Sequence, residues 1–295
     1  MKFIFLFFVI LSSFFATGQN NFQEKYKSLG SVYLFELKNA PFPDPKRADG
    51  YIYDNKKYST EEHYKDSSVL VFVPKNFKWS KRPDILIHFH GWFNHLDSMN
   101  VTFHLIEQFA AAQKNALLIL PQGPKDAPDS FGGKLESPDG FKKLIFEILD
   151  SVAKKENKAR LEPHDIIISG HSGGYRVMSY ILLHGGLTKN IKEVWLFDAL
   201  YGQTEKFAFW LQQKNARFVN IYTKNGGTFI QSEELERDMS GWQIPFRSGN
   251  ESELTDELLK NNKILSIFTP LEHNETLYKT EFFRKLVLCS KYLGR

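Results

Sequence analysis

Residues 166–176, IIISGHSGGYR, contain the pattern that decides the fold. Three β-branched residues predict a short buried strand. The small residues after them predict a sharp backbone turn that leaves one side chain exposed, and a helical pattern follows over 175–184. Residues 170–174 match G-x-S-x-G, a strand-to-helix turn that presents a nucleophilic serine. Ser172 is therefore the candidate nucleophile.

The residue types around Ser172 fit this chemistry. Gly170 and Gly174 remove side-chain bulk two positions away on each side, as the strained geometry of such a turn requires. The backbone N–H of Gly173 points toward the same space, near the start of the next helix, where it can stabilise an oxyanion. A glycine-rich connection without catalytic chemistry is the alternative interpretation.

Short apolar runs alternate with helical patterns along most of the chain. The predicted strands cover 32–37, 69–73, 85–89, 116–120, 166–168, 194–197, 218–222 and 264–268. The predicted helices cover 101–112, 141–152, 175–184, 207–213 and 276–292. This alternation predicts an α/β fold with a mostly parallel sheet and helices on both faces. No internal repeat or linker is visible, so residues 19–295 are expected to form a single domain.

A serine hydroxyl needs a base and an acid, which are expected to follow it in the order Ser, Asp or Glu, His. His273 comes just after the last predicted strand and is the only histidine after His184, so it is the candidate base. Asp198 follows the strand 194–197, from where a carboxylate can reach an imidazole on a neighbouring loop. The more usual position for the acid follows the next strand, where the sequence has no acidic residue. The rivals there and further along the chain are Asn225, Glu233, Glu234 and Asp238.

A second turn of interest ends the strand in ILIHFHGWFNH, residues 85–95. Its His90–Gly91 pair resembles the oxyanion-hole turn of lipases and esterases, in which the next residue donates its backbone N–H. That resemblance assigns Trp92 as the donor that acts together with Gly173. The alternative is a metal site formed by His88, His90 and His95. No nearby carboxylate in the sequence supports such a site.

The stretches HFHGW, LLILPQGP and HDIIISGHSGG, with the order Ser, Asp, His, resemble the α/β-hydrolases. The sequence is similar to the secreted esterase group that includes polyhydroxyalkanoate depolymerase-like and feruloyl-esterase-like proteins, and it departs from them in the acid position and in the long polar segment 228–262. The resemblance implies the α/β-hydrolase fold and a serine esterase that forms an acyl-enzyme on a small-molecule or polymer-derived ester, without metal or cofactor. Peptidases, amidases and non-catalytic binding proteins share this fold and remain alternatives.

Several residues near these turns are candidates for substrate binding. Arg176 lies one helical turn after Ser172, where it either holds a substrate carboxylate or phosphate or forms an ion pair that positions loops. His171 is a poor base for its neighbour, because adjacent side chains on a tight turn diverge, so it either packs beneath the turn or lines the pocket. The segment 121–133 is expected to line the pocket, and 228–262 is a candidate lid. Aromatic pocket walls are expected from Trp92, Phe93, Phe131, Tyr201 and Trp242.

Residues 1–18 have the pattern of a signal peptide, with Lys2, a short apolar run and a small-residue cleavage site at Gly18. We therefore expect a periplasmic or extracellular protein, with an uncleaved N-terminal anchor as the alternative. No later stretch is apolar enough to cross a membrane. The net charge of +4 comes from interspersed acidic and basic residues, which argues against a nucleic-acid partner. A single cysteine, Cys289, excludes internal disulfides.

Overall fold

Nine strands form one mixed sheet in the order β1-β4-β6-β5-β7-β8-β9-β11-β10. The computed structural model describes residues 22–213 and 216–294, so the predicted signal peptide lies outside the described residues. In chain order the strands are β1 (Gly30–Glu36), β4 (Ser68–Pro74), β5 (Asp84–Phe89), β6 (Ala116–Pro121), β7 (Ile166–His171), β8 (Ile191–Phe197), β9 (Arg217–Thr223), β10 (Arg247–Asn250) and β11 (Ile264–Thr269).

The pairing of these strands is antiparallel at one edge and parallel elsewhere. β1 pairs antiparallel with β4, and β4 pairs antiparallel with β6. Every other neighbouring pair is parallel, from β6 through to β10. The carboxyl ends of β5, β7, β8, β9 and β11 therefore meet at one edge of the sheet, where open α/β folds bind their ligands. The predicted fold class is confirmed.

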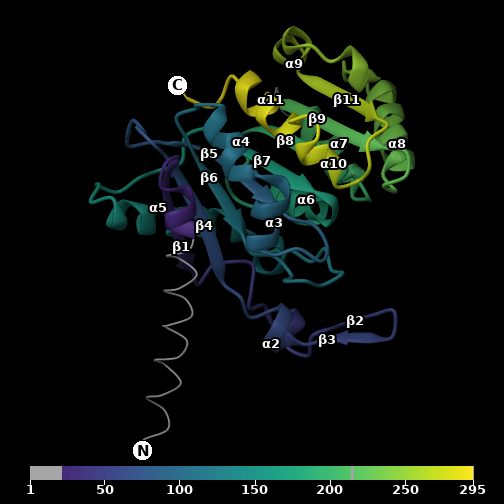
Figure 1. Ribbon diagram of the computed structural model, residues 1–295. Helices are drawn as coiled ribbons and strands as arrows, with labels where there is room; N and C mark the ends of the chain where they lie inside the picture. Colours follow the sequence, from purple (N-terminus) through teal and green to yellow (C-terminus); the bar gives the residue numbers. More distant parts are fainter. Residues whose placement is uncertain (1–21, 214–215, 295) are drawn as a thin grey trace, which may run out of the picture.

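Helices cover both faces of the sheet, because the central strands bury residues on both sides (Figure 1). In β7, Ile166 and Ile168 belong to one core cluster and Ile167 to the other. The first cluster includes apolar residues of α5 (Gly140–Lys155), α6 (Tyr175–His184), α7 (Thr204–Gln213) and α8 (Phe229–Gly241). The second includes residues of α3 (Leu96–Phe103), α4 (Leu105–Ala111), α9 (Asp256–Asn261), α10 (Glu275–Tyr278) and α11 (Phe282–Cys289).

Two predicted helices are each broken in the structure. The prediction over 101–112 corresponds to the end of α3 and to α4, which are separated by His104 with φ of 51°. The prediction over 276–292 corresponds to α10 and α11, which are separated by residues 279–281, and Glu281 immediately before α11 has φ of 53°. A left-handed residue ends a helix, but helices on both sides of it can face the same core. The apolar periodicity therefore continues across the break.

A small hairpin lies outside the main sheet, where the sequence predicted only a connection. It consists of β2 (Tyr51–Tyr53) and β3 (Lys56–Tyr58), is followed by α2 (Thr60–His63), and projects away from the sheet in Figure 1. Asp54 and Asn55 form its turn, both with positive φ. Asp and Asn tolerate this conformation and favour two-residue hairpin loops, so this pair was an available sequence signal.

The polar segment 228–262 contributes α8, β10 and α9 to the sheet and its covering layers. Leu235, Met239 and Leu259 from this segment are buried in the two core clusters. None of its residues lines the pocket around Ser172. The segment therefore packs on the sheet and is not a lid over that pocket. Within the described residues, the helices are too short or too polar to cross a membrane.

Candidate active site

Ser172 lies on a sharp turn between β7 and α6. The strand ends at His171, a single 3₁₀ turn η3 (Ser172–Gly174) follows, and the helix begins at Tyr175. Ser172 has φ of 53°, a left-handed conformation that is uncommon for a residue with a side chain. A Cβ atom on Gly174 would lie 2.7 Å from the carbonyl oxygen of Phe89, so the turn needs glycine there for close packing. The geometry agrees with the predicted nucleophile turn.

Asp198 and His273 are brought together from the ends of two other strands. Asp198 follows β8 and is fully buried, and His273 lies on the loop between β11 and α10. The distance from His273 Nδ1 to Asp198 Oδ2 is 2.6 Å. A carboxylate can only accept, so His273 donates from Nδ1 and its Nε2 keeps the lone pair that can accept a proton.

The carboxylate of Asp198 is held by several further donors. Its Oδ1 accepts from the backbone N–H of Thr223 at 3.0 Å and from the hydroxyl of Thr228, and its Oδ2 accepts from the hydroxyl of Thr223 at 2.9 Å. Burial acts to raise the pKa of Asp198, but the hydrogen bonds from His273 and Thr228 outweigh it, and the pKa is lowered. Asp198 therefore stays charged beside the imidazole.

Ser172 and His273 line one pocket of about 630 Å³. No hydrogen bond joins the Ser172 hydroxyl to the His273 ring within the described residues. Catalytic hydrogen bonds are often long in substrate-free sites and tighten when substrate binds. The sequence-predicted residues that line this pocket are Trp92, Phe93, His171, Gly173 and Tyr201. Phe131 and Trp242 do not line it.

His171 packs directly against the candidate base. Its ring centroid lies 4.5 Å from that of His273, and its Nε2 donates to the backbone carbonyl of His273 at 3.2 Å. Burial, with a smaller contribution from His273, lowers the pKa of His171 to about 3. His171 is thus a neutral ring that both supports His273 and lines the pocket.

Arg176 is committed to an ion pair and does not line the pocket. Its Nε and Nη2 donate to the two carboxylate oxygens of Glu136 at 2.7 and 2.9 Å. Glu136 lies on η2 (Gly133–Glu136) and its side chain is only 5% exposed. The assignment of Arg176 to substrate binding is therefore not supported by its position. Its guanidinium instead neutralises a buried carboxylate, which is the loop-positioning alternative.

The two predicted oxyanion donors flank Ser172. The turn after β5 passes so close that a Cβ on Gly91 would lie 2.4 Å from Ser172 Cβ. The indole of Trp92 lies over Gly173, where a Cβ would approach Trp92 Cδ1 to 2.7 Å, and its Nε1 donates to Ser130 Oγ at 2.8 Å. Within the described part of the chain, the backbone N–H of Trp92 has no partner. It is available to a substrate oxygen.

The three histidines considered as a metal site turn to separate partners. His88 Nδ1 bonds Ser169 Oγ at 2.8 Å, and His95 Nδ1 bonds Asp126 at 2.7 Å. His90 bonds backbone atoms and Gln122. Among the described residues, the cluster with ligand atoms close enough for a metal lies elsewhere, at Asp84, His164 and Asp165. The metal interpretation of His88, His90 and His95 is therefore wrong.

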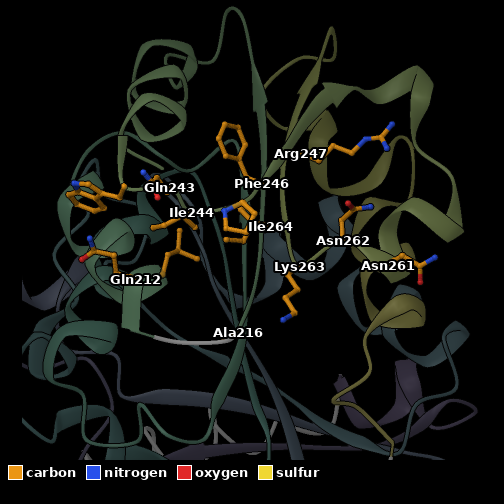
Figure 2. A pocket seen from close by; sticks show the side chains of 13 residues that line it. Gln212, Ala216, Gln243, Ile244, Phe246, Arg247, Asn261, Asn262, Lys263 and Ile264 are labelled. Carbon is orange, nitrogen blue, oxygen red and sulfur yellow. The ribbon is translucent and has the colours of Figure 1, made fainter. Parts of the chain in front are cut away.

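A second cavity, of about 620 Å³, lies at the amino ends of the strands, and Figure 2 shows the side chains that line it. Its lining includes Ala216, Arg247 and Ile264, which lie at the amino ends of β9, β10 and β11. Trp242 lines this cavity, so its prediction as a wall of the Ser172 pocket is wrong. The candidate catalytic residues all lie at the carboxyl ends of their strands, as in other α/β folds.

Sequence reasoning missed the residues that support the candidate triad. Thr223 and Thr228 hold Asp198 across separations of 25 and 30 residues. Gly226 is packed so closely that a Cβ would lie 1.7 Å from Asp198 Oδ2. The run Gly226–Gly227 before Thr228 signalled a tight loop, but no local pattern connects it to Asp198.

The fold matches solved structures, whereas no protein-family model and no curated protein matches the sequence. A ferulic acid esterase is similar with a TM-score of 0.55 and 13% identity, over 90% of this chain and 99% of that chain. A feruloyl esterase module from Clostridium thermocellum, complexed with sinapinate, gives a TM-score of 0.53 and 10% identity over 90% of each chain. The fluorophosphonate-binding serine hydrolase F of Staphylococcus aureus gives 0.50 and 10% identity, over 88% of this chain and 97% of that chain. The chain has the α/β-hydrolase fold.

Proposed function

We propose that this protein is an exported serine hydrolase that cleaves carboxylic esters. The observation that carries the proposal is the 2.6 Å contact between His273 and the buried Asp198, together with a pocket that both His273 and Ser172 line. The three side chains come from the carboxyl ends of three different strands. Such a convergence of nucleophile, base and acid is recognised by geometry and not by sequence position.

In the proposed reaction, Ser172 Oγ attacks the acyl carbonyl carbon and its proton passes to His273 Nε2. Asp198 orients the ring and stabilises the imidazolium that forms. The tetrahedral intermediate collapses, the C–O bond to the alcohol breaks, and His273 protonates the departing oxygen. Water then attacks the acyl-enzyme as His273 takes its proton, which releases the acid and restores Ser172.

The negative oxygen of the intermediate is received by the backbone N–H groups of Trp92 and Gly173. Donors of this kind act where charge develops, and the loss of one costs about 2.7–4 kcal/mol of transition-state stabilisation. The partnerless N–H of Trp92 and the tight approach of Gly91 to Ser172 support this role.

The lining of the pocket favours an uncharged ester. Within the described residues it contains no Asp, Glu, Lys or Arg side chain. Its walls are aromatic at Trp92, Phe93 and Tyr201, and polar but neutral at Asn94 and Asn274. A substrate carboxylate or phosphate would find no cationic partner there, because Arg176 is held by Glu136.

The test uses a fluorophosphonate probe and a panel of p-nitrophenyl esters and aminoacyl anilides. We expect the wild-type protein to be labelled at Ser172 and to hydrolyse the esters. Ser172→Ala should abolish labelling and lower kcat by about a millionfold. Ser240→Ala, at an exposed serine of α8, should leave both unchanged. Hydrolysis of the anilides alone would identify the protein as an amidase and not an esterase. A wild-type protein that is neither labelled nor active would favour a non-catalytic binding protein.

A further inference from the structure

His90 is buried beside the candidate oxyanion turn and belongs to neither the triad nor the pocket lining. Its two ring nitrogens are both engaged. Nδ1 lies 2.8 Å from the carbonyl oxygen of Gly91. Nε2 lies 2.8 Å from the backbone nitrogen of Gly123 and 3.0 Å from the side-chain nitrogen of Gln122.

These partners determine the protonation of the ring. The carbonyl of Gly91 can only accept, so Nδ1 carries the hydrogen. The backbone N–H of Gly123 can only donate, so Nε2 presents its lone pair. Burial lowers the pKa of His90, which agrees with a neutral ring between these groups. Only one tautomer satisfies every partner.

The carbonyl that His90 holds belongs to the same peptide unit as the N–H of Trp92. This peptide is trans, and a trans peptide is planar with its C=O and N–H pointing in opposite directions. A hydrogen bond that fixes the carbonyl on one side therefore fixes the N–H on the other side. The peptide itself lies beside the nucleophile turn, because Gly91 packs against the Ser172 side chain.

We propose that His90 is a positioning residue, which aims the N–H of Trp92 at the substrate oxyanion by holding the carbonyl of Gly91. This role rests on the proposed function. Gln122 connects the arrangement to the neighbouring helix, because its Oε1 accepts from the backbone N–H of Leu96 at the start of α3 at 3.0 Å. The oxyanion peptide is thereby anchored to the end of β6 as well as to its own strand.

The test uses two substitutions, each of which keeps the hydrogen bond made by only one of the two ring nitrogens. In His90→Asn the side-chain amide can occupy the place of Nδ1 and donate to Gly91, whereas the contact to Gly123 is lost. In His90→Gln the side-chain oxygen can occupy the place of Nε2 and accept from Gly123, whereas the donor to Gly91 is lost. His90→Leu loses both contacts.

We expect His90→Asn to retain kcat within about threefold, and His90→Gln and His90→Leu to lose about tenfold to a hundredfold in kcat with KM changed less than about twofold. A transition-state donor that is misaimed affects kcat and not substrate binding. Fluorophosphonate labelling should slow in the same order. His88→Leu removes a buried histidine of β5, two residues before His90 and outside this network, and should leave kcat unchanged.

A role in folding alone would give a different result. His90→Asn and His90→Gln would then both lower the urea midpoint, while kcat per folded molecule stayed at the wild-type value, and this would overturn the inference. An equal loss of kcat in His90→Asn and His90→Gln would also overturn the inference. A second measurement uses Trp92→Pro, which removes the N–H itself. In the Trp92→Pro background, His90→Gln should lower kcat by less than about a further twofold, because both changes act on one donor.

The failure of the proposed function is distinguishable from the failure of this inference. The proposed function fails if wild-type protein is neither labelled nor active, or if Ser172→Ala keeps its activity. The inference fails alone if wild-type protein is active through Ser172 and His90→Gln has the wild-type kcat.

Discussion

Asp198 shows how a single carboxylate is prepared for a role beside a histidine. It is fully buried and accepts hydrogen bonds from His273, Thr223 and Thr228. These donors compensate for the loss of water that burial imposes on a charged group. The same bonds fix the direction of the oxygen that faces His273, so the tautomer of the ring follows from the surroundings of the acid.

Replacement of this acid should be costly to catalysis. Asp198→Asn is expected to lower kcat by about ten-thousandfold, because an amide can donate to His273 Nδ1 and stabilise the wrong tautomer. Ester hydrolysis under saturating substrate measures the effect. The matched controls are Glu233→Gln and Glu234→Gln, both at exposed positions of α8, which should retain wild-type kcat. Loss of activity in either control with activity retained in Asp198→Asn would reassign the acid.

The proposed oxyanion donor and the proposed nucleophile are brought together by a contact between two backbone turns. The turn after β5 and the turn after β7 approach so closely at Gly91 and Ser172 that no side chain fits between them. β5 and β7 are adjacent parallel strands, in register from Ile85 with Ile166 to Phe89 with Gly170. The register of the central strands therefore sets the geometry of the candidate site.

A methyl group at this contact should separate the two turns. Gly91→Ala would place Cβ 2.9 Å from Ser172 Oγ, so we expect kcat to fall by about a hundredfold or more. Gly241→Ala is the control, since a Cβ there meets nothing within 4 Å. The effect is measured as kcat for ester hydrolysis by both variants, divided by the folded fraction from circular dichroism. Wild-type kcat in Gly91→Ala would show that the turns do not need this contact.

The segment between β6 and α5 is held by two arginine clamps. Arg47 donates to both oxygens of Asp129 at 2.7 and 3.1 Å, and Arg176 donates to both oxygens of Glu136. The ring of Phe131 lies 4.6 Å from the Arg47 guanidinium and 5.5 Å from that of Arg176. Between these clamps lies Ser130, which receives the indole N–H of Trp92.

Loss of one clamp should affect stability more than substrate choice. Arg176→Met leaves Glu136 buried without its partner, and we expect a loss of about 2–3 kcal/mol in the free energy of unfolding, measured with urea. Arg284→Met, which breaks an exposed pair with Glu281, should cost less than about 1 kcal/mol. The relative kcat/KM for neutral and carboxylate-bearing esters should stay constant in Arg176→Met. A selective loss of the charged esters would return Arg176 to substrate binding.

The molecule as a whole buries several neutral histidines, and this predicts a pH-dependent stability. Burial lowers the pKa of His88, His90 and His171 from an ordinary value of 6.5, to about 3 for His171. Below pH 6.5 the unfolded chain therefore binds protons that the native protein does not, and stability falls as the pH falls toward 3. Each such histidine lowers the free energy of unfolding by up to about 1.4 kcal/mol for each pH unit below its ordinary pKa.

We expect the free energy of unfolding in urea to be clearly smaller at pH 5 than at pH 7, and the slope to be shallower in His171→Phe. The change comes from groups that charge only when the chain unfolds, whereas the lowered pKa of Asp198 adds its loss at still lower pH. An equal slope in His171→Phe and wild type would show that His171 takes up its proton without unfolding.

The sequence by itself determined the alternation of strands and helices, the parallel sheet and the place of Ser172, because these depend on residues close together in the chain. It also ranked Asp198 and His273 as partners, from their positions at strand ends. Apolar periodicity did not predict the polar edge strand β10 or the breaks in two helices, where it is weak or continuous, and the hairpin β2–β3 was signalled only by its turn residues.

Only the tertiary structure decided which side chains meet. It paired Arg176 with Glu136 across 40 residues, placed Trp242 at the far edge of the sheet, and set His90 against the peptide that precedes Trp92. The pairing of Arg176 and the placement of His90 depend on which polar atoms find a partner once water has been excluded. That competition is settled between segments distant in sequence, so no local pattern records it.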